Sequence, residues 1–251
     1  MCIRDSLMAL LSVNINKFAL LRNSRGMNNP DLAEVAKKCI EFGAQGITLH
    51  PRPDERHAKF SDLPIISKLV SNHSNIELNI EGYPSKKFID EVKEIKPNQV
   101  TLVPDPPGAL TSSFGWDCSD NKQLLSEVVS KFRSNNIRVS LFINPSKKTL
   151  ENLSDIKADR VELYTFDYAI NYNTSPQNSI LPYLEVVKFL KTITNININA
   201  GHDLNLNNLE YLLKNISVIQ EVSIGHALVC DSFEYGLKKT IGKYLSITNK
   251  Y

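Results

Sequence analysis

Short runs rich in Val, Ile and Leu alternate along the chain with longer stretches in which apolar residues recur at helical spacing. This alternation is typical of βα units that build a parallel sheet. Eight runs have the length and composition of strands: Leu10–Asn16, Gly46–Arg52, Ile76–Ile80, Gln99–Pro104, Arg138–Asn144, Arg160–Phe166, Asn195–Ala200 and Glu221–Ala227. The helical period is clearest in Pro30–Phe42, Lys122–Ser134 and Leu181–Thr192.

Eight such units predict a single (β/α)8 barrel, an eight-stranded parallel α/β fold whose active site lies at the carboxyl ends of the strands. An open doubly wound sheet is the alternative, and it usually carries a glycine-rich first βα turn. The turn after the first run, Asn16-Lys17-Phe18-Ala19, contains no glycine, which favours the barrel. We expect residues 8–251 to form one catalytic domain and residues 1–7, which have no pattern, to be an N-terminal extension.

Composition excludes several partners. The 251 residues include 29 basic and 27 acidic ones, so the net charge is only +2. A charge this small does not indicate binding to nucleic acid or to an anionic membrane. The apolar runs are shorter than the roughly 18 residues that would span a bilayer. Four cysteines, Cys2, Cys39, Cys118 and Cys230, lack CxxC spacing. We therefore expect free thiols and a cytoplasmic location.

Histidines gather where the predicted strands end. Gly201-His202-Asp203 follows one strand, and Gly225-His226 ends another. A histidine beside exposed backbone N–H groups suits acid/base chemistry on a phosphorylated substrate. His50 and His57 also fall at or just after a strand end, so four of the five histidines in the chain share this placement. In a barrel they converge on one mouth.

Other polar residues join them. Asn14, Asn16 and Lys17 end the first strand, Arg52 follows His50, and Glu162 lies on the sixth strand. Residues two apart share a face of a strand, so both asparagines can point into the mouth. A hydrogen-bonded structural network inside the barrel is the alternative interpretation.

Two carboxylates compete for one role at the third strand. Glu77 lies on the strand and Glu81 just past its predicted end, on the same face if the strand continues. Burial inside a barrel raises a carboxyl pKa, which suits a general base near neutrality. Position alone favours Glu81, because it lies nearer the strand end. Both glutamates remain candidates for the general base.

Two long polar segments complete the prediction. Residues 22–30, with Arg22 and Arg25, have the composition of a phosphate-binding loop or of a solvated turn. Asp105–Asp120 has the length of a lid, and its Trp116 could close over a ligand or pack beside the barrel.

Taken together, these segments resemble the pyridoxine 5′-phosphate synthase family from about Leu11 to Lys243. The resemblance rests on collinear motifs: Val13-Asn14-Ile15-Asn16, Leu21-Arg22-Asn23-Ser24-Arg25-Gly26, Gly46-Ile47-Thr48-Leu49-His50-Pro51-Arg52 with Arg56-His57, Asn75-Ile76-Glu77, Leu102-Val103-Pro104, Val139-Ser140-Leu141-Phe142-Ile143, Asn199-Ala200-Gly201-His202 and Ile224-Gly225-His226-Ala227. It implies condensation of 1-deoxy-D-xylulose 5-phosphate with 3-amino-2-oxopropyl phosphate to pyridoxine 5′-phosphate, phosphate and water. It also implies a homo-octamer built from dimers, and neither a metal nor an organic cofactor.

The resemblance also assigns roles. It makes His50 and Glu77 proton acceptors, His202 the proton donor, and Glu162 a stabiliser of the transition state, so it selects Glu77 over Glu81. It gives the amino-ketone phosphate to Asn14, Arg25 and Gly225-His226. It gives the deoxyxylulose phosphate to Arg52, His57 and Thr111.

Two positions depart from the family pattern. Asn16-Lys17 stands where many members carry Asp-His, and Asp203 stands where a glycine is frequent. All three remain candidate substrate contacts, Asp203 through its backbone N–H, because its carboxylate would repel a phosphate unless it points away.

The residues leave other functions open. Imidazoles and carboxylates at a barrel mouth also fit a metal-dependent phosphosugar epimerase or aldolase. A Schiff-base aldolase fits less well, because Arg160–Phe166 contains no lysine. A catalytically silent phosphate-binding barrel is the non-enzymatic alternative, which so many titratable groups at the mouth disfavour.

Overall fold

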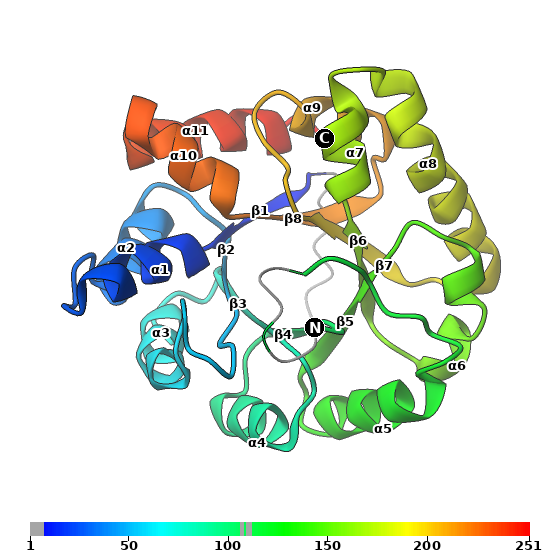
Figure 1. Cartoon of the computed structure of the whole chain (residues 1–251), viewed down its shortest axis with the longest axis horizontal. Coiled ribbons are helices and arrows are strands. Elements are labelled where there is room, and N and C mark those ends of the chain that lie inside the picture. Colours follow the sequence, from blue (N-terminus) through cyan, green and yellow to red (C-terminus); the bar gives the residue numbers. More distant parts are fainter. Residues whose placement is uncertain (1–7, 106–107, 109–111) are drawn as a thin grey trace.

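Eight parallel strands close into a barrel in sequence order in the computed structural model of the chain (Figure 1), which describes residues 8–105, 108 and 112–251. The strands are β1 (Leu10–Asn14), β2 (Gly46–Leu49), β3 (Glu77–Gly82), β4 (Gln99–Leu102), β5 (Arg138–Ile143), β6 (Arg160–Tyr164), β7 (Asn197–Gly201) and β8 (Ile219–Ile224). All eight predicted strands are confirmed, mostly one to three residues shorter at their ends. β3 and β7 run past their predicted ends, β3 as far as Gly82, so that it includes Glu81, and β7 as far as Gly201. β8 begins two residues before its predicted start.

Helices surround the barrel (Figure 1). They are α1 (Asn16–Arg25), α2 (Leu32–Glu41), α3 (Leu63–Ser71), α4 (Lys86–Ile95), α5 (Lys122–Arg133), α6 (Leu153–Ile156), α7 (Phe166–Tyr172), α8 (Pro176–Ile193), α9 (Leu209–Asn215), α10 (His226–Tyr235) and α11 (Leu237–Thr248), with 3-10 turns at Phe60–Asp62 and Lys148–Leu150. α2 begins after its N-cap Asp31, whose carboxylate accepts hydrogen bonds from the N–H groups of Ala33 and Glu34.

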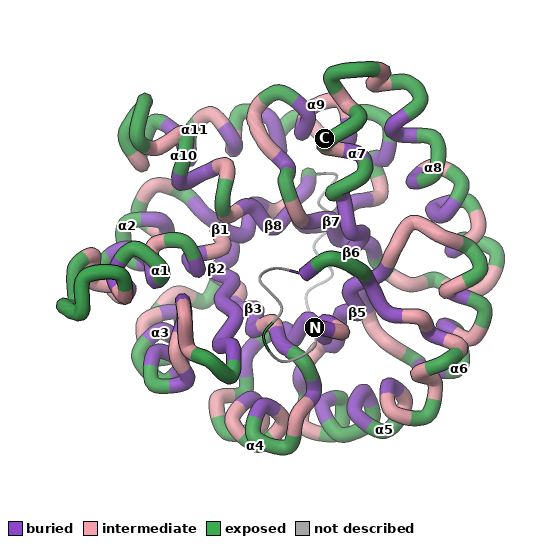
Figure 2. Tube along the Cα trace, viewed as in Figure 1, coloured by how far each residue is buried: buried purple, intermediate pink, exposed green. Residues whose placement is uncertain are grey.

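Buried residues run along the strands and recur in the surrounding helices (Figure 2). The buried apolar residues of strands and helices form one large cluster, because alternate strand residues face outward toward the helices. The barrel interior is polar instead. The hydroxyls of Ser12 and Thr48 lie 2.7 Å apart, Asn79 Nδ2 donates to Thr48 Oγ1 at 3.3 Å, and Thr101 Oγ1 donates to Asn79 Oδ1 at 3.0 Å. Buried polar groups of this kind satisfy one another, so a hydrogen-bonded layer forms the floor beneath the mouth.

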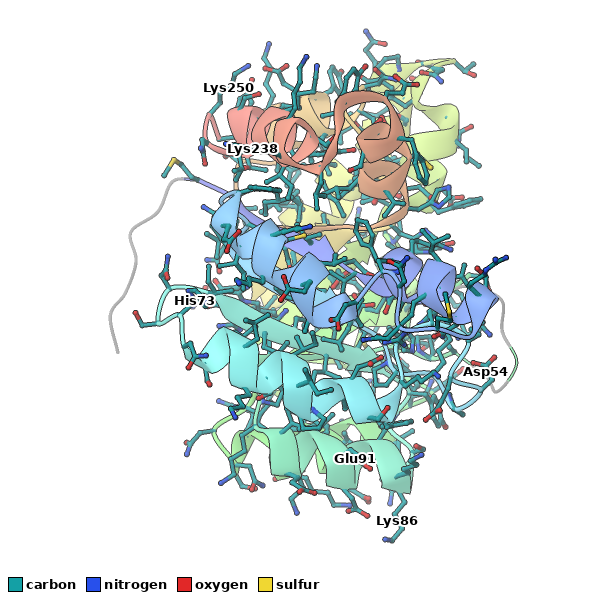
Figure 3. The ribbon with its side chains drawn as sticks, turned by 90° about the vertical axis from the view of Figure 1, so that its left-hand side faces the viewer. Asp54, His73, Lys86, Glu91, Lys238 and Lys250 are labelled. Atoms are coloured by element: carbon teal, nitrogen blue, oxygen red, sulfur yellow. The ribbon has the colours of Figure 1, made fainter. Side chains whose placement is uncertain are left out.

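The two ends of the barrel are distinguished by the loops that flank the strands. Asp54 follows β2 and His73 precedes β3, and the two lie at opposite ends of the molecule (Figure 3). The end that carries Asp54 is therefore the mouth, where the strands reach their carboxyl ends. In the described part of the chain no helix is long and apolar enough to cross a membrane. Cys39, Cys118 and Cys230 are free thiols, as predicted.

Candidate active site

Side chains from β1, the segment after β2, and β3 meet at the mouth through two asparagines. The N–H of Asn16 donates to Asn14 Oδ1 at 3.1 Å, and the N–H of His50 donates to Asn16 Oδ1 at 2.9 Å. Asn14 Nδ2 in turn donates to Glu81 Oε2 at 3.3 Å. Asn16 uses its side-chain oxygen as a hydrogen-bond acceptor, a task that an aspartate at this position can also perform. The departure at this position therefore preserves the link between β1 and His50.

His50 and Glu81 are the two titratable side chains of this cluster. Nδ1 of His50 lies 3.9 Å from Glu81 Oε2, and both side chains are buried. Burial, followed by the positive charges of Arg52 and its neighbours, lowers the pKa of His50 well below its usual 6.5. Burial, followed by the charge of Asp105, raises the pKa of Glu81 to about 7. His50 is thus neutral and able to accept a proton, and Glu81 can exchange one near neutrality.

Glu162 on β6 contributes a second buried carboxyl. Burial, followed by the charge of Glu81, raises the pKa of Glu162 well above its usual value, so this group is a neutral acid while Glu81 is ionised. Its Oε1 lies against β7, where a Cβ added to Gly201 would stand 2.2 Å away. Among the described residues its buried Oε2 has no hydrogen-bond partner. This oxygen is placed to form a hydrogen bond with a substrate atom.

The structure does not bring Glu77 to this site. Glu77 is the first residue of β3, in register with Gly46 at the start of β2, and its carboxylate pairs with Arg138 at the start of β5. Four residues along a strand separate it from Glu81 by about 13 Å. The sequence carried a signal of this, because Asn75-Ile76-Glu77 is repeated as Asn79-Ile80-Glu81 and the family motif fits both copies.

His202 and Asp203 follow β7 on the far side of the mouth. The imidazole of His202 packs edge-on against Tyr164, with 4.8 Å between ring centroids, and its Nδ1 lies 2.8 Å from Asp203 Oδ2. The Asp203 carboxylate therefore points to the imidazole rather than standing alone beside a ligand.

Candidate phosphate ligands lie around the rim. Arg52 forms a buried ion pair with Asp105, which also accepts a hydrogen bond from Ser112 at 2.7 Å. The imidazole of His57 lies 5.8 Å from that of His50, and burial followed by the charge of Arg52 lowers its pKa to about 4. The Arg52 guanidinium and the His57 imidazole therefore lie at the mouth, as predicted. The imidazole of His57 is neutral at pH 7 because of its lowered pKa.

The remaining predicted contacts divide into three groups. Gly225 is the N-cap of α10 and His226 is the first residue of that helix, so N–H groups of a helix N-terminus face this end of the barrel. Lys17 is exposed at the start of α1, close enough for its charge to lower the pKa of both His57 and Asp203. Thr111 lies outside the described residues.

The predicted arginine loop at residues 22–30 is wrong in its first half, which is the end of α1. Arg22 is buried, and its guanidinium donates to both carboxylate oxygens of Asp62 at 2.7 and 3.0 Å. Asn23 Nδ2 lies 2.7 Å from the carbonyl oxygen of His57. These two residues attach α1 to the segment after β2. Arg25 is exposed at the end of the helix.

Trp116 packs beside the barrel, the second of the two roles predicted for it. It is 3% exposed, and its Nε1 donates to the carbonyl oxygen of Leu102 at 2.9 Å. The described residues contain no group of three or more His, Cys, Asp or Glu side chains placed to hold a metal ion.

The mouth of this (β/α)8 barrel therefore holds a neutral buried imidazole and two buried carboxyls with raised pKa values, which are features of a barrel enzyme that uses acid/base catalysis. The chain belongs to the family described as "Pyridoxal phosphate biosynthesis protein PdxJ", which it matches over residues 11–250. It is 50% identical over 238 residues to pyridoxine 5′-phosphate synthase of Cytophaga hutchinsonii, covering 95% of this chain and 98% of that one. It is 49% identical over 242 residues to the enzyme of the same name from Parabacteroides distasonis, covering 96% and 100%.

Solved structures of low sequence identity share the fold alone. A mutant tryptophan synthase α-subunit from Pyrococcus furiosus superimposes with a TM-score of 0.63 at 15% identity, covering 96% of this chain and 98% of that one. A phosphoribosyl anthranilate isomerase superimposes with a TM-score of 0.60 at 15% identity, covering 97% and 100%. Both likenesses agree with the observed closed barrel.

Proposed function

We propose that this chain is a ring-forming synthase that condenses 1-deoxy-D-xylulose 5-phosphate with 3-amino-2-oxopropyl phosphate to give pyridoxine 5′-phosphate, phosphate and water. The family match and relatives about half identical over nearly their whole length support this function. The observation in the structure that carries it is the buried trio of His50, Glu81 and Glu162, because the reaction needs several proton transfers at one place.

The roles follow from the protonation states. His50 and Glu81 accept protons, with Glu81 in the role that the sequence motif gave to Glu77. His202 donates a proton from the opposite side of the mouth. Glu162, held as a neutral acid, donates a hydrogen bond to charge that develops on the substrate.

Two phosphate positions are proposed at the rim. The N-terminus of α10 at Gly225-His226, beside Asn14, suits the phosphate of the amino ketone, since a Cβ on Gly225 would stand 3.0 Å from Asn14 Cβ. Arg52 and His57 suit the deoxyxylulose phosphate. For Arg52 this requires the phosphate to share or replace its bond to Asp105.

The assay that tests this function mixes purified protein with both phosphorylated substrates, with and without a chelator, and follows the product by absorbance and mass. Equal product formation in both samples is the expected result. Activity lost on chelation would favour the metal-dependent alternative. Substrate binding without product in either sample would favour the silent binding barrel.

We also propose that the chain works in the cytoplasm as a homo-oligomer, namely a homo-octamer built from dimers. α1 projects outward beside α10 (Figure 1), and it carries Leu20 and Leu21, which are 41% and 49% exposed. Phe233 on α10 is 78% exposed. Apolar side chains gathered in this way are typical of a subunit interface. The free buried thiols of Cys39 and Cys118 suit a reducing compartment.

Such an interface would explain Arg25, which ends α1 about 14 Å of helix away from Asn16 at the mouth. An exposed arginine at this end of the helix is placed to reach a phosphate bound by a neighbouring subunit. The test mixes two inactive variants, Arg25→Ala and His202→Ala, after dissociation and reassembly. Restored turnover is expected. Turnover that stays absent in oligomers shown by light scattering to contain both variants would contradict the shared site.

A further inference from the structure

The residues that follow β7, His202 and Asp203, form a hydrogen-bonded pair in an unusual backbone conformation. Their φ angles are 89° and 57°, a region that residues with side chains seldom adopt and that recurs at functional sites. Within this turn the imidazole Nδ1 lies 2.8 Å from the carboxylate Oδ2. The two side chains are 20% and 37% exposed, so the pair stands at the edge of the mouth.

Neighbouring segments hold this turn from two sides. Thr165, which follows β6, places its Oγ1 2.8 Å from the carbonyl oxygen of Gly201 and 2.5 Å from that of His202. Asn208, which precedes α9, donates from its Nδ2 to the carbonyl oxygen of Asp203 at 3.2 Å. The orientation of the pair is therefore fixed by tertiary structure as well as by its own hydrogen bond.

The charges around Asp203 keep it ionised. The hydrogen bond from His202, helped by positive charge on His226 and Lys17, lowers the pKa of Asp203 below its usual value. An ionised carboxylate only accepts hydrogen bonds, so Nδ1 of the imidazole must carry a hydrogen. Nε2 is then the nitrogen that releases and takes up a proton. The rings of Tyr164 and Phe142, with centroids 4.8 and 6.3 Å away, restrict the imidazole plane further.

We propose that Asp203 is a positioning residue that fixes the tautomer and ring orientation of His202, so that Nε2 delivers the proton. This inference rests on the proposed donor role of His202. It replaces the expectation that Asp203 contacts substrate, and it gives a purpose to a carboxylate that stands where many family members have glycine.

Steady-state kinetics of Asp203→Asn and Asp203→Ala test the proposal. We expect kcat to fall about 10- to 100-fold, as for loss of an outer hydrogen-bond partner that orients a functional histidine, with KM for both substrates within about twofold. Asp167→Asn is the matched control, because this exposed aspartate lies at the start of the adjacent α7. A raised KM with unchanged kcat would overturn the proposal in favour of direct substrate contact. Unchanged kcat and KM would overturn it as well.

Two further measurements separate positioning from folding. Nitrogen-15 NMR of the imidazole should show Nδ1 protonated in the parent protein and a mixture of tautomers in Asp203→Ala, at equal thermal stability. In a His202→Ala background, Asp203→Ala should cause no additional loss of the residual turnover that single-turnover assays at high enzyme concentration detect. An additive loss would contradict the proposal, because a positioning residue acts only through its partner.

The controls also locate any failure. If the parent protein forms no product, the proposed function fails. If His202→Ala retains full turnover, the donor role fails. If His202→Ala loses turnover and both Asp203 variants retain it, the positioning inference alone fails.

Discussion

At the scale of single residues, burial acts on the two acid/base partners in opposite directions. Removal from water disfavours whichever form is charged, so it lowers the pKa of His50 and raises that of Glu81. The same environment therefore prepares an acceptor that is neutral and a carboxyl that exchanges its proton near pH 7. Nearby charges modify these shifts without reversing them, since Arg52 lowers the pKa of Glu81 and Asp105 raises it.

Paired substitutions distinguish the two glutamates of β3. We expect Glu81→Gln to reduce kcat about 10²- to 10⁴-fold, because a positioned acid/base group is lost. Glu77→Gln, 13 Å or so away at the other end of the strand, should retain most of the activity. In the parent, kcat/KM should fall as pH drops below about 7, because Glu81 becomes protonated. Full activity of Glu81→Gln together with loss in Glu77→Gln would restore the role to Glu77.

At the scale of elements, the pairing of β6 with β7 leaves room for the carboxyl group of Glu162 beside Gly201. Gly201 ends β7, and its missing side chain leaves the space that Glu162 Oε1 occupies. Gly201→Ala should push the Glu162 side chain out of place and reduce kcat by about 10²-fold, comparable with loss of one stabilising donor. Thermal unfolding measured beside the kinetics checks that the barrel survives. A variant with unchanged kcat would show that Glu162 tolerates displacement.

The sequence predicts strands and helices well where hydrophobic spacing is strong. It predicts them less well where contacts between polar residues hold the element in place. All eight strands follow from their Val, Ile and Leu content. No helix is predicted over α1, whose residues read as a strand end, a turn and a polar loop, because its partners are distant in sequence: buried Arg22 pairs with Asp62, forty residues away. The same limit applies to Glu77 and Glu81, since a repeated tripeptide cannot indicate which copy reaches the mouth.

At the scale of the whole molecule, the titratable side chains inside the barrel influence one another's pKa values. Burial raises the pKa of Glu221 on β8, and the charge of Arg160, with which Glu221 forms an ion pair at 3.1 Å, opposes that shift. Gln99 donates to the same carboxylate at 3.4 Å. Hydrophobic spacing located this barrel, and it gave no information on which polar side chains pair inside it, because those pairs join strands far apart in the chain.

The buried groups make folding stability depend on pH with a definite sign. Glu81 and Glu162 have raised pKa values, so the folded state holds protons that the unfolded chain releases, and stability falls as pH rises above the usual 4.5. His50 and His57 have lowered pKa values, so stability falls as pH drops below their usual 6.5. The two effects oppose each other between these values. Above pH 6.5 the histidine effect ends and the carboxyl effect remains.

We therefore expect the free energy of unfolding to decline from pH 6.5 to pH 8, with a slope of up to about 1.4 kcal/mol per pH unit for each proton retained. Urea unfolding at constant ionic strength measures it. Glu81→Gln, which mimics the protonated carboxyl, should flatten the slope. The difference in stability between this variant and the parent should therefore shift in favour of the variant from pH 5 to pH 8. A parent whose stability rises over this range would contradict the raised pKa of the buried carboxyls, and with it the basis on which Glu81 exchanges protons at the mouth.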